Sequence, residues 1–171
     1  MSDQSVRGEP VSFSERLAGS QAFGILFKEG MALVEETAGY LDGPGRQESK
    51  QLERSAALVY ATESMRLTTR LMQLASWLLL HRAVKEGEMS LAQASKEKNK
   101  VKFGAGDRPD EDNLALLPEP LRGLIERSLK LHDRVRRLDA TIHSASEETP
   151  LGNPVERQLG LLKAAFEREG R

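Results

Sequence analysis

Apolar side chains recur at three- and four-residue steps over most of the chain, which is the period of an α-helix that buries one face. The first such stretch runs from about residue 12 to Leu41, and Ser12 with Glu15 has the spacing of a capping box at its start. Its inward positions are Phe23, Leu26, Phe27, Gly30, Leu33, Val34, Ala38 and Leu41. The run Asp42-Gly43-Pro44-Gly45 predicts a turn, because glycine and proline interrupt helices.

A second helix is predicted from about Gln47 to Glu86, and Gly87 can end it. At 1.5 Å per residue, ~40 residues make a rod of roughly 60 Å. An apolar arc covers about half of the circumference of its second half. The arc contains Met65, Leu67, Leu71, Met72, Leu74, Ala75, Leu78 and Leu79. Together with Trp77 and Leu80 on the opposite side, it is wider than two neighbouring helices cover, which predicts a homodimer.

Residues 87–119 are predicted to form a connector. Ser90 and Gln93 form a second candidate capping box, which favours a short helix over about 91–99. The glycines, prolines and acidic residues that follow, up to Asp112, predict an exposed loop. A third long helix is predicted over about 121–145, because apolar positions repeat there every seven residues. One row is Leu121, Ser128, Val135 and Ile142, and the other is Leu124, Leu131 and Leu138.

Three long helices predict an all-α fold, an antiparallel up-down-up three-helix bundle. We expect the bundle domain over residues 12–145, between a disordered tail over 1–11 and a flexible tail over 146–171. Asn153 and Pro154 are suited to start a short amphipathic helix in the second tail. Its apolar face would carry Val155, Leu159, Leu162 and Phe166. This segment is either a lid on the bundle or a tethered peptide for another protein.

Composition narrows the function classes. The chain has 25 Lys and Arg against 26 Asp and Glu, a net charge of -1. Proteins that bind nucleic acid or anionic lipid usually have a basic excess, so neither partner is expected. The longest apolar run, Leu74 to Leu80, is far shorter than the ~20 residues that span a bilayer. The first twenty residues lack the apolar run of a signal peptide. We therefore expect a cytoplasmic protein.

The sequence offers no recognisable catalytic, metal or cofactor site. It has no cysteine, which excludes disulfides, thiolate zinc sites and cysteine nucleophiles. His132 and His143 would lie about 16 Å apart along one helix, too far to share a metal ion. The step Gly104-Ala105-Gly106 lacks the following helix and lysine of a phosphate-binding loop. We therefore expect a protein that is not an enzyme.

Two surfaces are candidates for protein interaction. One face of the second helix carries Arg66, Arg70, Gln73, Trp77 and Leu80. Tryptophan and arginine are enriched in binding hot spots. The alternative is that the other helices or the connector cover this face, with Glu35 or Glu36 paired to the arginines.

The second surface is a basic stripe on the third helix, opposite its apolar rows. It consists of Arg127, Lys130, Arg134 and Arg137. Such a stripe is either a solvated face or a docking site for an acidic protein.

Two segments carry a resemblance to a known family. Residues Phe23 to Gly45 contain Leu-Phe-Lys-Glu-Gly-Met-Ala-Leu-Val-Glu-Glu-Thr-Ala-Gly-Tyr-Leu-Asp, and residues Tyr60 to Met89 contain Glu-Ser-Met-Arg-Leu-Thr-Thr-Arg-Leu-Met. These segments resemble the RcdA family of alphaproteobacteria, the regulators of CtrA degradation. The resemblance covers about residues 20–103.

The resemblance implies a non-enzymatic adaptor that forms homodimers of three-helix bundles and needs no cofactor. RcdA-type proteins help to deliver cell-cycle regulators such as CtrA to the ClpXP protease. Their partners are ClpX, the CpdR-type response regulator and a cyclic-di-GMP effector, and a cell-pole location would fit this role. The alternative is a structural homodimeric interaction protein with no protease role.

Overall fold

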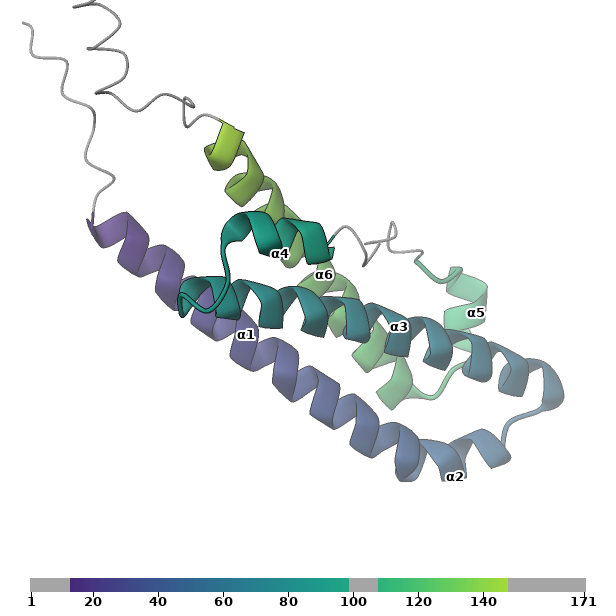
Figure 1. The fold of residues 1–171 in the computed structure, drawn as a ribbon. Coiled ribbons are helices and arrows are strands. Elements are labelled where there is room, and N and C mark those ends of the chain that lie inside the picture. Colours follow the sequence, from purple (N-terminus) through teal and green to yellow (C-terminus); the bar gives the residue numbers. More distant parts are fainter. Residues whose placement is uncertain (1–12, 99–107, 148–171) are drawn as a thin grey trace, which may run out of the picture. The chain divides into compact units, whose positions relative to one another are not determined.

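Helices are the regular elements of the computed structural model, which describes residues 13–98 and 108–147. They are α1 (Phe13–Asp42), α2 (Pro44–Lys50), α3 (Arg54–Lys85), α4 (Leu91–Lys98), α5 (Glu111–Ala115) and α6 (Glu119–Glu147) (Figure 1). These residues contain no strand, so the prediction of an all-α fold is confirmed. The predicted tail over 1–11 and most of the predicted tail over 146–171 lie outside the described residues.

The chain divides into two compact units at Val135, within α6. The second unit holds the last turns of that helix, where the Thr141 hydroxyl donates a hydrogen bond to the Arg137 carbonyl oxygen (3.0 Å). Helices α1 to α5 and the part of α6 up to Val135 belong to the first unit.

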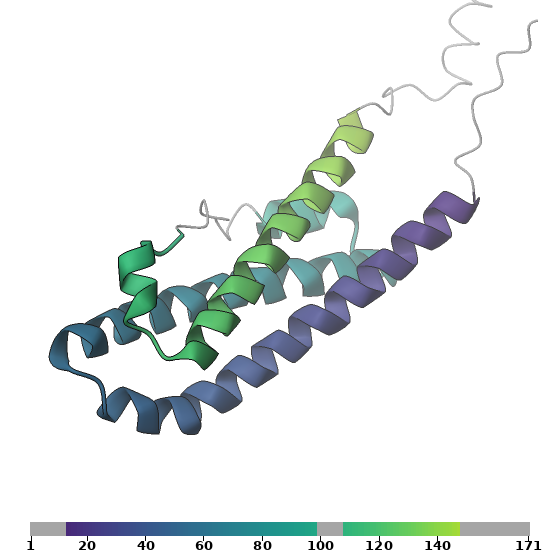
Figure 2. The same ribbon diagram turned by 180° about the vertical axis from the view of Figure 1, so that it is seen from behind.

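The core of the first unit forms where α1, α3 and the first half of α6 meet. α1 and α3 run side by side in opposite directions, with α2 at the end where they join (Figures 1 and 2). Gly30 leaves room for close packing of α1 against both other helices, because a Cβ atom there would lie 2.5 Å from Leu78 Cδ1 and 3.6 Å from Leu131 Cδ2. The large apolar side chains with almost no exposed surface are Leu33, Leu67, Leu74, Trp77, Leu78, Leu121, Ile125, Leu131 and Val135.

Both apolar rows predicted on the third helix are buried as far as Val135. Leu124 and Leu131 are 4% and 1% exposed, and Ser128 is fully buried. The helix begins at Glu119, two residues before the predicted start.

The prediction of one helix from Gln47 to Glu86 is wrong in its first part. α2 ends at Lys50, and Glu53 is extended, with φ −60° and ψ 156°, before α3 begins. A hydrogen bond of 2.7 Å from the Tyr40 hydroxyl to Glu48 holds α2 against the end of α1. This contact joins residues of different helices. The break between α2 and α3 contains no glycine or proline that would indicate it in the sequence.

The other predicted boundaries of α3 and α4 are confirmed. Gly87 has φ 77°, a left-handed conformation that suits glycine. The Gly87 and Glu88 amides donate to the Val84 and Ala83 carbonyl oxygens, which is the Schellman arrangement at a helix end. The capping box at the start of α4 is also present. The Gln93 amide donates to Ser90 Oγ (3.2 Å), and the Ser90 amide donates to Gln93 Oε1 (3.0 Å).

The prediction of an exposed loop through the acidic part of the connector is wrong, because α5 forms there. Asp110 is its N-cap residue, and Glu111 and Asp112 occupy its first turn. Acidic side chains at this position stabilise a helix by interacting with its dipole, so the acidic residues were a helix signal. Residues 99–107 of the connector lie outside the described residues.

Replacing Gly45 by alanine is expected to destabilise the fold by about 1–3 kcal/mol, as overpacking does. The added Cβ would lie 2.7 Å from the Tyr60 hydroxyl oxygen and 2.8 Å from the Tyr40 carbonyl oxygen. The matched control is Gly39→Ala, where the Cβ has nothing within 4 Å and should stabilise α1 by up to about 1 kcal/mol. Thermal unfolding of both variants tests this contrast, and a Gly45→Ala variant as stable as the unmodified chain would contradict it.

Candidate protein-docking site

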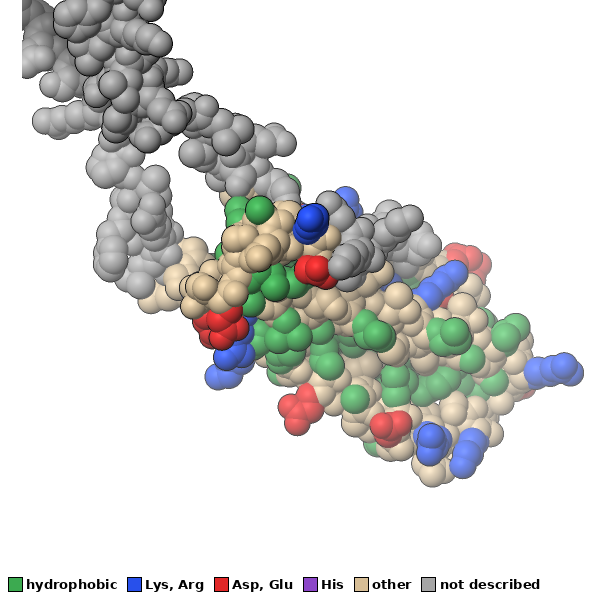
Figure 3. Space-filling model, in the orientation of Figure 1, with side chains coloured by type: hydrophobic (Ala, Val, Ile, Leu, Met, Phe, Trp, Pro, Cys, Tyr) green, Lys and Arg blue, Asp and Glu red, His purple; other side chains and the backbone are tan. Residues whose placement is uncertain are grey.

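Four large apolar side chains form an exposed row along α3. Leu58, Met65, Met72 and Leu79 are 70%, 71%, 66% and 52% exposed. They are spaced by seven residues, close to two helical turns, so they share one side of the helix. At 1.5 Å per residue the row is about 32 Å long. Hydrophobic side chains run along this side of the molecule in Figure 3, with charged ones at the margins. A row of exposed large apolar side chains of this kind is typical of an interaction site.

The α3 row is the outer part of the apolar arc predicted from the sequence. The inner part, which includes Leu67, Leu71, Leu74 and Leu78, packs into the core. Leu58 extends the α3 row by one heptad beyond the predicted arc. It was not among the residues predicted from the sequence. Its seven-residue spacing from Met65 was the signal that could have found it.

A groove of about 170 Å³ adjoins the α3 row, between α1 and α3. It is lined by Val34, Thr37, Ala38, Leu41, Thr68, Leu71, Met72 and Ala75. The Thr68 hydroxyl donates to the Ser64 carbonyl oxygen (2.8 Å). The Thr37 hydroxyl oxygen is buried and has no hydrogen-bond partner among the described residues. Because the other six lining residues are apolar, a groove of this volume can accept an apolar side chain.

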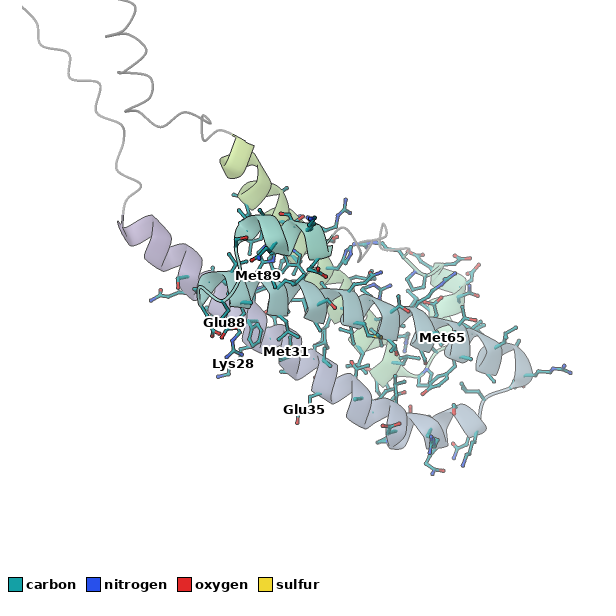
Figure 4. The ribbon with its side chains drawn as sticks, in the orientation of Figure 1. Lys28, Met31, Glu35, Met65, Glu88 and Met89 are labelled. Atoms are coloured by element: carbon teal, nitrogen blue, oxygen red, sulfur yellow. The ribbon has the colours of Figure 1, made fainter. Side chains whose placement is uncertain are left out.

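Charged residues mark the two ends of the α3 row. Glu53 and Arg54 stand before its first residue, and both are exposed. Beyond its last residue, Arg82 forms an ion pair with Glu86 (3.0 Å), and Lys85 Nζ donates to the Ser20 carbonyl oxygen (2.9 Å). In Figure 4, Met65 marks the α3 row, and the labelled residues Lys28, Met31 and Glu35 mark the neighbouring helix α1. An apolar strip with charges at both ends favours a partner that is apolar in its middle.

Trp77 and Arg70, two residues of the predicted hot-spot face, lie in the core. Trp77 is 1% exposed, and its ring stacks on the His81 imidazole with 3.9 Å between ring centroids. Arg70 is 6% exposed, and its Nη1 donates to the Ser128 hydroxyl (2.8 Å). Phe23 of α1 also packs near the indole, 6.3 Å between centroids. Neighbouring helices therefore cover this part of the face, as the alternative interpretation had it.

The rest of the predicted hot-spot face reaches the surface. Arg66 is exposed and pairs with Glu63 of its own helix (2.9 Å), whose side chain is only 3% exposed. Gln73 and Leu80 are half-buried. Glu36 does not pair with these arginines but with Arg127 (2.7 Å). A role of Arg66, Gln73 and Leu80 in binding another protein stays a prediction.

Three of the four residues of the basic stripe form ion pairs within the chain. Arg127 pairs with Glu36, and Arg134 pairs with Glu29 of α1 at 2.6 Å. Lys130 pairs with Glu126, one turn earlier on α6 (2.8 Å). Arg137 is exposed and belongs to the second unit. An acidic partner would have to compete with Glu29 and Glu36, and docking on this stripe stays a prediction.

The pair of Glu36 and Arg127 should give a small, acid-sensitive contribution to stability. The Arg127 hydrogen bond lowers the pKa of the Glu36 carboxyl below its ordinary value of 4.5. The contribution is therefore present above pH 4.5 and is lost as the pH falls through the lowered pKa. Because both side chains are about half exposed, a double-mutant cycle of Glu36→Gln and Arg127→Ala should give only about 0.2–1 kcal/mol at neutral pH. Coupling that persists at pH 2, read from urea unfolding, would contradict this assignment.

The apolar residues of the predicted C-terminal helix, Val155, Leu159, Leu162 and Phe166, lie outside the described residues. Within the described part, no three His, Asp or Glu side chains come together as metal ligands could. None of the helices described has an apolar stretch long enough to cross a bilayer.

The chain matches, over residues 14–166, the family described as "Protein of unknown function (DUF1465)". It therefore belongs to that family. Among solved structures, it is similar to RcdA from Caulobacter crescentus CB15, with 56% identity and a TM-score of 0.56. The similarity covers 68% of this chain and 87% of the RcdA chain. The resemblance to RcdA that the sequence carries is thus confirmed. The comparison with curated proteins gives no match.

Proposed function

We propose that this protein is a non-enzymatic adaptor that helps to deliver cell-cycle regulators, such as CtrA, to the ClpXP protease. The observation that carries the proposal is the 56% identity to RcdA over 87% of the RcdA chain. The open apolar α3 row supports it, because an adaptor acts through surfaces that bind other proteins. The partners that follow are ClpX, a CpdR-type response regulator, a cyclic-di-GMP effector and the cargo, at a cell pole. The fold that goes with this proposal is an antiparallel bundle of α1, α3 and α6.

We further propose that the chain is a homodimer and that the α3 row is the contact between the two copies. In an antiparallel arrangement, Leu58 of one copy lies opposite Leu79 of the other, and Met65 lies opposite Met72. The same arrangement brings Glu53 near Lys85 of the second copy, and Arg54 near its Glu86. A parallel arrangement would instead place each Arg54 beside its like-charged equivalent, which is unfavourable. Charge complementarity at the ends therefore favours the antiparallel dimer.

Reconstituted degradation tests the adaptor function. Purified ClpXP is mixed with CtrA, a CpdR-type regulator and the cyclic-di-GMP effector, with and without this chain. We expect CtrA to be degraded faster only when the chain is present. The control is a ClpXP substrate that needs no adaptor, which should be degraded at an unchanged rate. Equal CtrA half-lives in the two mixtures would favour the alternative, a structural homodimer with no protease role.

Deleting residues 150–171 is expected to stop cargo delivery and to leave the melting temperature unchanged. This segment starts with prolines and a glycine, which are residues that interrupt helices, and its four apolar residues span too few turns for a helix that is stable alone. As a tether, it would raise the effective concentration of cargo at the protease. A lid would instead lower the melting temperature by several degrees when deleted. Degradation at the full rate by the truncated chain would contradict a role in delivery.

A further inference from the structure

We infer that Met65 and Met72 are a modification site at which oxidation of the thioether controls docking on the α3 row. The inference rests on the proposed use of that row as a contact between two copies. Both side chains lie in the middle of the row, one heptad apart, and about two thirds of each is exposed. Leucine occupies the two outer positions. Sulfur thus stands at the centre of the only row of exposed large apolar side chains that the described part of α3 carries.

The chemistry is a two-electron oxidation by a peroxide. A lone pair on the methionine sulfur attacks one peroxide oxygen, and the O–O bond breaks as the S–O bond forms. The other oxygen leaves with the electron pair and, after proton transfer, is released as water when the oxidant is hydrogen peroxide. The sulfur becomes a sulfoxide, which reductases can convert back to the thioether. The chain has no cysteine, so no thiol competes for the oxidant.

Exposure distinguishes these two methionines from the other two that the structure describes. Met31 and Met89 are half-buried, so peroxide should reach their sulfur atoms more slowly. The sulfoxide replaces a flexible apolar tip by a strongly polar one, which disrupts methionine-rich contacts. An antiparallel contact would bury four sulfoxides, two from each copy, against an apolar surface that offers few hydrogen-bond donors. Oxidation should therefore weaken docking, whereas the free chain keeps its fold because both side chains already face water.

The test compares the chain before and after treatment with hydrogen peroxide. Peptide mass spectrometry locates the sulfoxides, and sedimentation equilibrium measures the dimer Kd. We expect Met65 and Met72 to be oxidised before Met31 and Met89, and the Kd to rise at least ~tenfold. The melting temperature should stay unchanged when it is measured well below the dimer Kd, where only the single copy unfolds. Methionine sulfoxide reductase should restore the original Kd. The matched control is the double variant Met65→Leu with Met72→Leu, whose own dimer Kd, measured before and after peroxide, should not change.

The outcomes separate this inference from the proposed dimer. If the untreated chain dimerises and full oxidation of both methionines leaves its Kd unchanged, the oxidation switch is wrong and the dimer stands. Earlier oxidation of Met31 or Met89, or a lowered melting temperature of the single copy after treatment, also overturns the switch. If the untreated chain stays monomeric at all concentrations, the dimer and the switch are both wrong.

Discussion

Replacing Trp77 by alanine is expected to lower the free energy of unfolding by about 3–5 kcal/mol, the usual cost of removing a large core aromatic. The indole is 1% exposed and contacts both His81 of its own helix and Phe23 of α1. Its loss leaves a cavity at the junction of α1 and α3 that neither helix can fill.

The matched control for Trp77 is Thr69→Ala, on the same helix α3 and outside the α3 row. Thr69 is exposed, so its truncation should change stability by no more than about 0.5 kcal/mol. Urea unfolding measures both variants. If Trp77→Ala unfolds at the same urea concentration as the unmodified chain, its side chain does not support the fold.

Replacing Met65 and Met72 together by glutamate is expected to abolish self-association without unfolding the chain. Both side chains face water in the single copy, so the charges are tolerated there. In the dimer the four carboxylates would be buried against apolar surface, which should raise the Kd more than ~100-fold, or about 2.7 kcal/mol.

Sedimentation equilibrium at several concentrations measures this effect. The control Arg122→Glu changes the net charge by the same amount at an exposed position on α6, and should leave the Kd unchanged. An unchanged Kd in the Met65→Glu, Met72→Glu variant would show that the contact between copies lies outside the α3 row. A Kd raised equally by Arg122→Glu would show that net charge, rather than the row, determines association.

The long helices could be predicted because their apolar periodicity continues over many turns. The seven-residue rows of α6 predicted its buried side, and Gly87 predicted the end of α3. The break before Arg54 could not be predicted in this way, because it depends on the contact between Tyr40 and Glu48 of different helices. A helix with an uninterrupted pattern gives no local sign of where tertiary contacts divide it.

The candidate site was predictable only in part. The sequence showed that the apolar arc of α3 is wider than two neighbouring helices cover. It did not show which part of the arc faces water. That choice depends on where α1 and α6 pack, and their positions buried Trp77 and Arg70 and left Met65 and Met72 open. The ion pairs from α1 to Arg127 and Arg134 could not be predicted either, because they join residues 91 and 105 positions apart in the sequence.

The hydrogen bond from Arg70 to Ser128 sets the register of α6 against α3. Ser128 stands in the middle of a row whose neighbours, one heptad away on either side, are Leu121 and Val135. If α6 slid by one heptad, an apolar side chain would replace the serine opposite the buried guanidinium, and this bond would be lost. Leucine contacts alone would tolerate such a slip, as they do in uniform coiled coils. A buried hydroxyl thus favours one alignment of α6 against α3 over others that would be equally apolar.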